Sequence, residues 1–511
     1  MGRSTARSVD RVWAGDRQRP DRPTGRREHT TLSPAPKIAA PMKSRAVHNF
    51  SILIASELTG QAIAFGLGAY LARKLGAQGF GVWAYAASIV TYLLIVVDGG
   101  TEVWGQREVS AHPGRLRQLI VNVGIVRLAL VLLAIVVLLV VAAASPVDHR
   151  WALIFGIGSL LVFVAQTSWA HRGLESVGPA TSNLVQRVLM AGLAFSFIHS
   201  PSQGAEVMLW QSLSDGAGAL VLLLLLWPRL SIRSASERVP TPSAVLRAAW
   251  PLGASRILRG LPHAATMILL GANWPISEVA HFGVATRIAL AVLVVSSVFS
   301  LVTFPALTRA HLAGGQSEQK ATHAAVRLFA LIFTPAIVGL VMVAHPFVVM
   351  AFSHQYVASV RPLQLLGVGF FMTGLTDNLR RLLHARHQQA LDLRLVFLAT
   401  TVGLGSASLL VPKHGALGAG WALILGEAAL LGLILFAIRR AGLTLGLLQA
   451  FAFPACASIL MAGAIGLLGS NSLAVSVLAG AAVYGSVMLF RRKPILADLS
   501  ALELDPEPDQ P

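Results

Sequence analysis

Long hydrophobic stretches separated by short polar segments make up most of the chain from residue 49 onward. Fourteen of them are long enough to cross a bilayer as a helix, which takes about 20 residues. They are predicted at 49–72, 80–104, 118–144, 151–170, 180–198, 206–227, 248–272, 280–304, 326–350, 362–379, 393–411, 418–438, 447–468 and 473–490. The pattern therefore predicts an all-α integral membrane protein.

The longest polar segment between these stretches divides them into two sets of six. Segment 228–247 contains SIRSASERVPTPS and reads as a cytoplasmic linker. We therefore predict an N-terminal lobe and a C-terminal lobe, followed by two extra helices and a cytoplasmic tail. The predicted boundaries are 49–227, 248–440, 447–490 and 491–511. Two six-helix halves are a common plan of alternating-access transporters.

Residues 1–48 are polar, contain eleven Lys and Arg residues, and lack the hydrophobic core of a signal peptide. We predict that they form a disordered basic cytoplasmic tail. A compact basic segment, MKSRAVHNF, starts at Met42 directly before the first hydrophobic stretch. This gives the hypothesis that translation starts at Met42.

Composition agrees with a membrane protein, because 55% of the residues are hydrophobic and only 13% are charged, against about 25% charged in soluble domains. Of the 41 Lys and Arg residues, 30 fall on the side of the N-terminus, 5 in the opposite loops and 6 within the stretches. By the positive-inside rule both termini are cytoplasmic. Arg127 and Arg187 lie near cytoplasmic ends, and we expect their side chains to extend to that surface. The net charge of +18 thus reflects orientation and attraction to anionic lipids, and predicts no nucleic-acid partner.

Several kinds of chemistry lack a sequence signal. The chain has no GxxxxGK[ST], HExxH, CxxC or GxSxG motif, and its histidines are scattered. The single cysteine, Cys456, excludes an intramolecular disulfide. We therefore predict no cofactor, no metal site and no catalytic residue.

One predicted helix, residues 248–273, carries polar residues that lipid should reject. Arg256, Arg259 and His263 are spaced by three and four residues, so they share one face. Each arginine costs about 2.5–3.5 kcal/mol at the bilayer centre, whereas each leucine or isoleucine returns about 0.3–0.6 kcal/mol. The seven leucines and isoleucines of this segment do not offset two arginines. This helix should therefore face protein or water.

Short segments rich in Gly and Ala beside the predicted helices form the most specific pattern. In chain order they are LARKLGAQGFGVWAYAAS (71–88), VVDGGTEVWGQREVSAH (96–112), QTSWAHRGLESVGPATSNLVQRVL (166–189), HFGVATRIALAV (281–292) with FPALTRAH (304–311), and HGALGAGWALILGE (414–427). Together with fourteen spans, they resemble the bacterial polysaccharide and O-antigen flippases of the multidrug/oligosaccharidyl-lipid/polysaccharide exporter superfamily. The resemblance covers about residues 49–440.

This resemblance implies a flippase, not an enzyme. It would move a polyprenyl-pyrophosphate-linked oligosaccharide across the bacterial inner membrane, for surface polysaccharide such as the O-antigen of lipopolysaccharide or exopolysaccharide. It also implies alternating access of the two lobes around a central cavity. Besides the lipid-linked substrate and membrane lipids, a polysaccharide polymerase or other assembly proteins are candidate partners.

The pyrophosphate of such a cargo requires fixed cations inside the cavity. Arginine suits this role because its planar guanidinium binds phosphate oxygens in pairs. We predict that Arg256, Arg259 and Arg287 bind the pyrophosphate, with His263 as a further contact. Pairing with acids between helices is the alternative for Arg256 and Arg259, extension to the outer surface for Arg287, and a bond to a backbone carbonyl for His263.

Acidic residues within the predicted spans are candidates for proton coupling or for ion pairs with these arginines. They are Glu57, Asp98, Asp215 and Glu427. We favour Glu57 for coupling or pairing, because the first span should face the cavity by resemblance. Asp98 and Glu102 lie near a cytoplasmic end and are expected to hold the loop at Arg107, and Glu427 has helix packing as an alternative.

Two other functions fit parts of the pattern. One is a cation-coupled drug or metabolite antiporter of the same superfamily, whose cavity would favour acids and aromatic residues. The other is a membrane-bound polysaccharide polymerase or transferase, which would need a larger outer loop than the roughly dozen residues found here. A scaffold subunit of a glycan assembly complex is a structural alternative.

Overall fold

The computed structural model describes residues 41–230, 240–386, 388–468 and 472–502. The chain divides into two units, Met1–His48 and Asn49–Pro511, and the description that follows concerns the second. Most of the predicted basic tail (1–40), part of the predicted linker (231–239) and the end of the C-terminal tail (503–511) lie outside the described residues.

Helices make up the regular structure of the described residues. Short 3-10 turns at Pro113–Arg115, Pro201–Gly204 and His354–Ser359 connect some of them. The α-helices are α1 (Pro41–Asp98), α2 (Thr101–Ala111), α3 (Leu116–Ala144), α4 (Val147–Phe163), α5 (Ser168–Gly173), α6 (Gly178–Phe197), α7 (Glu206–Leu230), α8 (Pro242–Asn273), α9 (Ile276–Ala313), α10 (Gly315–Phe352), α11 (Val360–Ala385), α12 (Gln389–Arg440), α13 (Leu447–Leu468), α14 (Leu473–Leu489) and α15 (Arg492–Leu502).

Two helices, α1 and α12, each contain two of the predicted stretches and break between them. The break in α1 is at Gly76 (φ 63°) and the break in α12 is at Gly415 (φ 55°). Positive φ is accessible to glycine because it lacks a Cβ atom. Each break therefore lies where the hydrophobic pattern placed a short polar turn between two spans.

By length and composition, seven of the described helices could cross a membrane, or eight if the bent pair α14 and α15 counts as one span. Since α1 and α12 each hold two predicted stretches, the helices are consistent with the predicted fourteen crossings. Several predicted ends are wrong. Helices α1 and α4 end at Asp98 and Phe163 instead of residues 104 and 170, α9 continues to Ala313 instead of 304, and α10 begins at Gly315 instead of 326. A left-handed turn at Gly99 and Gly100 separates α1 from α2.

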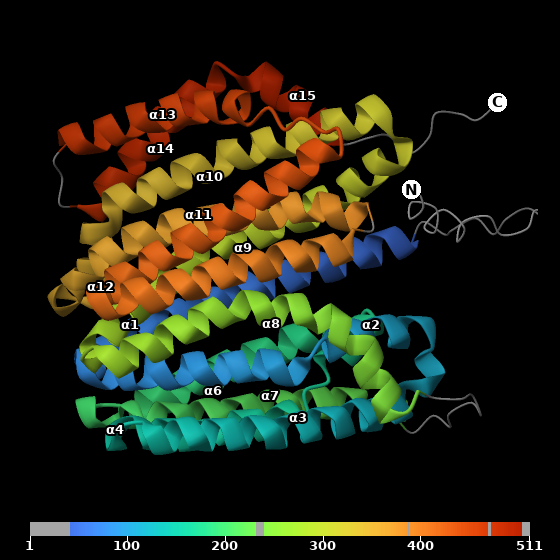
Figure 1. Ribbon diagram of the computed structural model, residues 1–511, viewed down its shortest axis with the longest axis vertical. Coiled ribbons are helices and arrows are strands. Elements are labelled where there is room, and N and C mark those ends of the chain that lie inside the picture. The colour runs from blue at the N-terminus through green and yellow to red at the C-terminus, as the bar shows by residue number, and fades with distance from the viewer. Residues whose placement is uncertain (1–40, 231–239, 387, 469–471, 503–511) are drawn as a thin grey trace, which may run out of the picture. The chain divides into compact units, whose positions relative to one another are not determined.

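The helices form two packed groups, and the helix axes in both are roughly aligned with one another (Figure 1). Helices α3, α4, α6 and α7 make one group, and α8 to α12 make the other, with α13 and α14 packed on α10. Helix α1 bonds to both: Tyr70 donates to the Ile198 carbonyl after α6, and Tyr356 after α10 donates to the Ala72 carbonyl. This arrangement confirms the predicted two-lobed helical fold with two additional helices.

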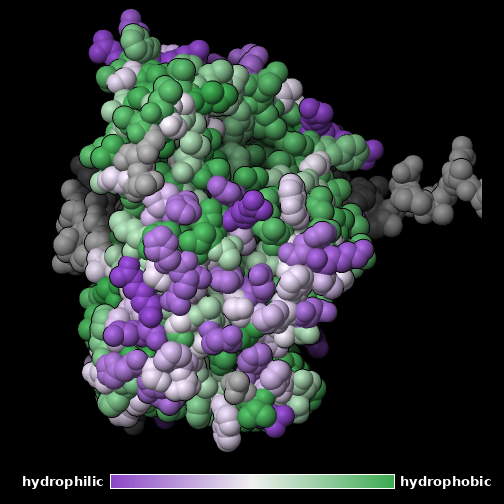
Figure 2. Space-filling model, turned by 90° about the vertical axis from the view of Figure 1, so that its left-hand side faces the viewer, coloured by the Kyte–Doolittle hydropathy of each residue, from purple (hydrophilic) through white to green (hydrophobic). Residues whose placement is uncertain are grey.

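The surface separates into hydrophobic helix sides and more polar helix ends. Leu132, Val136 and Val140 on α3 are 57%, 57% and 65% exposed, as expected of side chains that face lipid. Figure 2 looks at the end of the helices that lies on the left in Figure 1. Hydrophobic residues dominate its upper part, and hydrophilic residues gather across the middle and lower parts.

Candidate functional site

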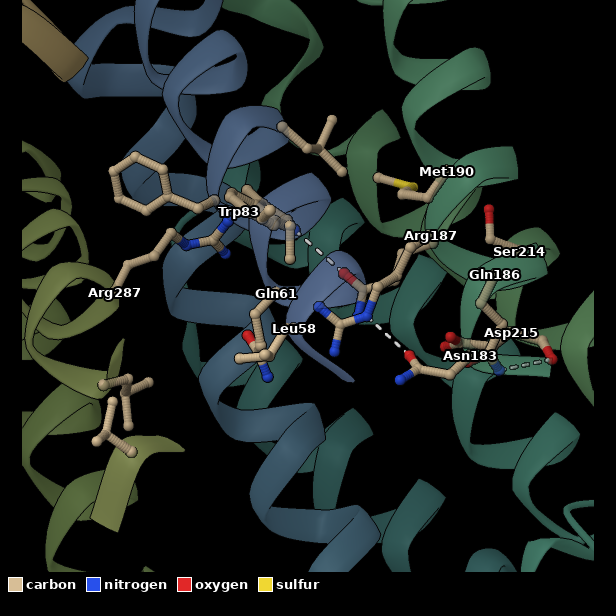
Figure 3. Close-up of a pocket in the computed structure, with 17 residues that line it drawn as sticks. Leu58, Gln61, Trp83, Asn183, Gln186, Arg187, Met190, Ser214, Asp215 and Arg287 are labelled. Carbon is tan, nitrogen blue, oxygen red and sulfur yellow. Dashed lines mark hydrogen bonds between the residues drawn. The ribbon is translucent and has the colours of Figure 1, made fainter. Parts of the chain in front are cut away.

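A cavity of about 720 Å³ lies between α1, α6, α7 and α9, and we call it the central cavity. It is bounded by both groups of helices, because α6 and α7 belong to one and α9 to the other. Arg287 enters from α9 and Arg187 from α6, with α1 between them (Figure 3). Its lining consists of Leu58, Gln61, Ala62, Ala64, Phe65, Leu67, Trp83, Asn183, Gln186, Arg187, Met190, Gln211, Ser214, Asp215, Arg287, Leu290 and Val295.

Arg287 is a charged residue of this cavity for which the described residues provide no acidic partner. Its guanidinium carbon lies 4.4 Å from the centre of the Trp83 ring and 6.0 Å from that of Phe80. A Cβ atom at Gly68 on α1 would lie 2.7 Å from Arg287 Cδ, so only glycine leaves room for the arginine. Cation–π contacts stabilise the charge and leave the guanidinium hydrogens free.

Arg187 is held on the opposite side of the same cavity. Its Nε donates to Asn183 Oδ1 (2.7 Å) and its Nη1 to the Gly60 carbonyl (2.5 Å). Glu57 lies farther off, 3.9 Å from Nη2. A Cβ atom at Gly60 would lie 3.0 Å from Arg187 Cδ. Two glycines of α1 therefore make room for the two cavity arginines.

The two arginines of α8 pair with acids, which is the alternative that the sequence left open for them. Arg256 Nη1 lies 3.2 Å from Asp98 and 3.6 Å from Glu102. Arg259 Nη2 lies 3.2 Å from Asp377 on α11 and 3.4 Å from Glu427 on α12. Arg256 thus ties α8 to α1 and α2, and Arg259 ties it to α11 and α12.

Asp98 also holds Arg127, and both side chains are buried, with 5% and 1% exposure. Arg127 donates to Asp98 (3.2 Å), to the Thr101 hydroxyl (2.9 Å) and to the Gln166 carbonyl (2.6 Å). The predicted extension of Arg127 to the cytoplasmic surface is therefore wrong. Its guanidinium finds an acid and two further acceptors inside the protein, so it does not need water.

Glu102, on the short helix α2, completes this cluster. It accepts from Arg172 (2.5 Å) and lies near Arg256. Burial raises the pKa of Glu102, but the charges of Arg172, Arg256 and Arg127 outweigh it and hold the pKa below the ordinary value. Glu102 therefore remains ionised, together with its arginines. Asp98 and Glu102 form their ion pairs with these arginines. Within the described residues, neither acid forms the expected ion pair with Arg107.

The remaining predicted site residues occupy three places. Glu57 accepts from Gln61 (2.8 Å) and Asn183 (3.2 Å) beside Arg187. Asp215 lines the central cavity and accepts from the Ser159 hydroxyl (2.7 Å). His263 lines a smaller cavity of about 290 Å³ with Arg259 and Glu427, and this cavity shares Leu290 with the central one.

Two further cavities adjoin the central cavity. The first, about 620 Å³ and almost entirely hydrophobic, lies between α9, α10, α13 and α14 and shares Phe65 and Val295 with it. The second, about 390 Å³ and rich in polar side chains, shares Asn183 and Gln186. Among the described residues no group of three or more His, Cys, Asp or Glu side chains is placed to hold a metal ion.

Sequence reasoning missed Arg187 and the hydrophobic cavity. Arg187 was assigned to the surface by its distance from a helix end. The segment QTSWAHRGLESVGPATSNLVQRVL contains Asn183, Gln186 and Arg187 at intervals of three and four residues, which places them on one helical face. That polar stripe was the available signal.

Comparisons with known proteins agree with this architecture. The family model described as "Polysaccharide biosynthesis protein" matches residues 46–311, slightly more than half of the chain. The structure resembles that of the lipid II flippase MurJ in an inward closed conformation, with a TM-score of 0.65 at 13% identity over 87% of this chain and 99% of that one.

It also resembles an inward-facing multidrug resistance MATE family transporter of the MOP superfamily, with a TM-score of 0.58 at 17% identity over 78% and 98% of the two chains. No curated protein sequence matches. At these identities the structural likeness shows the fold, a transporter fold of membrane-spanning helices.

Proposed function

The chain belongs to the polysaccharide biosynthesis protein family of membrane proteins, as its resemblance predicted, and on this basis we propose that it flips a lipid-linked oligosaccharide. The cargo would cross the bacterial inner membrane from the cytoplasmic to the outer leaflet, without chemical change. It would then serve the synthesis of a surface polysaccharide. We further propose lobes at 49–227 and 248–440 and two cytoplasmic termini, which the Lys and Arg asymmetry supports.

The observation that carries this proposal is that a cationic cavity adjoins a hydrophobic one. Arg187 and Arg287 line the first, and Phe65 and Val295 line both. A lipid-linked oligosaccharide carries a pyrophosphate directly attached to a polyprenyl chain. An anion in the central cavity would therefore have its hydrocarbon chain beside a hydrophobic surface, where burial is favourable by about 25 cal/mol per Å².

We assign the pyrophosphate contact to Arg287 and Arg187. Arg259 and His263 stay in the proposal as residues of the small cavity next to it, and Arg256 as the residue that holds α8 against α1. Glu57 and Asp215 are the proposed coupling acids, because both lie at the central or polar cavity. Asp98 and Glu427 act through their ion pairs.

A cation-coupled drug antiporter fits this cavity less well. A cationic drug entering it would meet Arg187 and Arg287, and like charges in a cavity of low dielectric repel strongly. The acids there are Glu57, 3.9 Å from Arg187, and Asp215 in the cavity lining, and they already accept hydrogen bonds from Gln61, Asn183 and Ser159.

The proposal is tested by Arg287→Ala in a cell whose surface glycan depends on this protein. Loss of one charge-assisted contact of about 1.5–3 kcal/mol should lower export about 10- to 150-fold. Surface glycan is measured with a lectin, and protein in the membrane by immunoblot. Arg117→Ala, at an exposed residue of α3, is the matched control. Normal export by Arg287→Ala would contradict the proposal.

A further inference from the structure

The polar cavity beside the central cavity has a composition unlike that of the other cavities. Its volume is about 390 Å³, within the range of small-ligand pockets. Side chains from each of the helices α1 to α7 and from the α4–α5 turn line it, among them Glu57, Glu102, Arg127, Gln166, Arg172, Asn183 and Gln186. Because Asn183 and Gln186 also line the central cavity, a ligand bound in one would lie directly beside a ligand bound in the other.

Charges in this polar cavity are matched by partners in the protein. Arg172 binds Glu102 at 2.5 Å, and Arg127 binds Asp98 at 3.2 Å. Glu57 accepts from Gln61 and Asn183. A ligand with its own charge would need to displace one of these partners, whereas an uncharged ligand would not.

The amide groups of the cavity, in contrast, keep unused hydrogen-bonding capacity. Gln186 Nε2 donates to the Asp215 carbonyl at 3.5 Å, and its Oε1 has no hydrogen-bond partner in the described parts of the chain. The Gln166 side-chain amide has no hydrogen-bond partner among the described residues. A Cβ atom at Gly218 would lie 2.5 Å from Gln186 Cδ, so the absence of a side chain there leaves room for the amide. An amide both donates and accepts, as a sugar hydroxyl does.

From these contacts we infer that the polar cavity binds an uncharged sugar of the cargo, next to its phosphate, and that Gln186 and Gln166 read its hydroxyl groups. The inference rests on the proposed function and adds where the sugar binds and which sugars fit. Sugar, phosphate and lipid then follow one another through the polar, central and hydrophobic cavities, in the order in which they are bonded in the cargo. A uronic acid in the polar cavity would bring a carboxylate that finds every guanidinium there already paired.

The test measures binding to the purified full chain in detergent micelles. The probes are a short-chain polyprenyl pyrophosphate carrying one neutral hexose, the same lipid without sugar, and the same lipid with a hexuronic acid. Gln166→Leu keeps the shape and removes the hydrogen-bonding groups, at a residue that lines the polar cavity and not the central one. We expect it to weaken binding of the hexose probe about fivefold and to leave the sugar-free probe unchanged. Gln118→Leu, at an exposed glutamine of α3, should change neither.

Each outcome points to one conclusion. Unchanged affinity of Gln166→Leu for the hexose probe, or an equal loss for both probes, would overturn the sugar site. Hexuronate binding as tight as hexose binding by the unmodified protein would overturn the preference for uncharged sugars. Arg287→Ala should weaken all three probes. If it weakens none while Gln166→Leu behaves as expected, the anion site of the proposed function fails instead. Unchanged binding of the sugar-free probe also shows that Gln166→Leu is folded.

Discussion

Arg259 and Arg287 lie on consecutive helices, yet the protein treats their charges in opposite ways. Arg259 lies within 3.4 Å of both Asp377 and Glu427. Arg287 lies in the central cavity against Trp83, without an acid among the described residues. A charge neutralised by the protein holds helices together, whereas one that the protein leaves without a counterion is available to an anionic ligand. The position of an arginine within a membrane helix does not distinguish the two cases. The presence or absence of an acidic partner does.

The largest effect should come from breaking the most buried pair. Asp98→Ala removes the acid that faces both Arg127 and Arg256 and leaves the buried Arg127 without an acid in direct contact. We expect a loss of about 3–5 kcal/mol in the free energy of unfolding, measured by unfolding in mixed micelles. Glu108→Ala, which breaks partly exposed pairs with Arg115 and His112, should cost about 1 kcal/mol. Equal losses would show that Arg127 does not depend on Asp98.

An intermediate effect should appear in a double-mutant cycle that compares the two arginines directly. In the free energy of unfolding, Arg259→Met and Glu427→Gln should show a coupling energy of about 1–2 kcal/mol, since their side chains are in contact. The cycle of Arg287→Met with Glu427→Gln should give about zero, within roughly 0.5 kcal/mol, because these residues do not interact. Coupling of similar size in both cycles would remove the contrast between the paired and the unpaired arginine.

The smallest effect should come from moving Arg287 without removing it. Gly68→Ala places a methyl group where Arg287 Cδ and the guanidinium lie, so the side chain must leave its place on Trp83. We expect export to fall about three- to tenfold, equivalent to about 0.7–1.4 kcal/mol, with normal amounts of protein. Gly66→Ala, two residues earlier with no atom near its Cβ position, should export normally. Equal export by the two variants would show that the position of Arg287 is unimportant.

Much of the helical pattern was predictable from the sequence, because a helix that crosses lipid needs about 20 mostly hydrophobic residues. The stretch predicted at 447–468 coincides with α13, and the polar turns near residues 76 and 415 coincide with the breaks in α1 and α12. Each of these features depends on nearby residues alone. Hydrophobic length and a local glycine are enough to specify them.

Partner choice was harder to predict because it depends on residues far apart in the chain. Arg259 meets Glu427, which is 168 residues away, and Arg127 meets Asp98 on another helix. The places made by Gly60 and Gly68 exist only once α6 and α9 approach α1. A sequence lists these arginines and acids but does not say which of them meet. The expectation that arginines inside membrane helices bind the ligand therefore included Arg256 and Arg259, whose charges are neutralised by acids in the folded protein.

The two ion-paired arginines of α8 also differ in when their partners are made. Asp98 precedes Arg256 in the chain, so it has already left the ribosome when α8 emerges. Glu427 follows Arg259 by 168 residues, which at about 5–20 residues per second takes roughly 10–30 s to synthesise. During that interval Asp98 is available to Arg256, whereas Glu427 is not yet available to Arg259. The order of residues along the chain thus sets the order in which α8 acquires its neighbours during biogenesis.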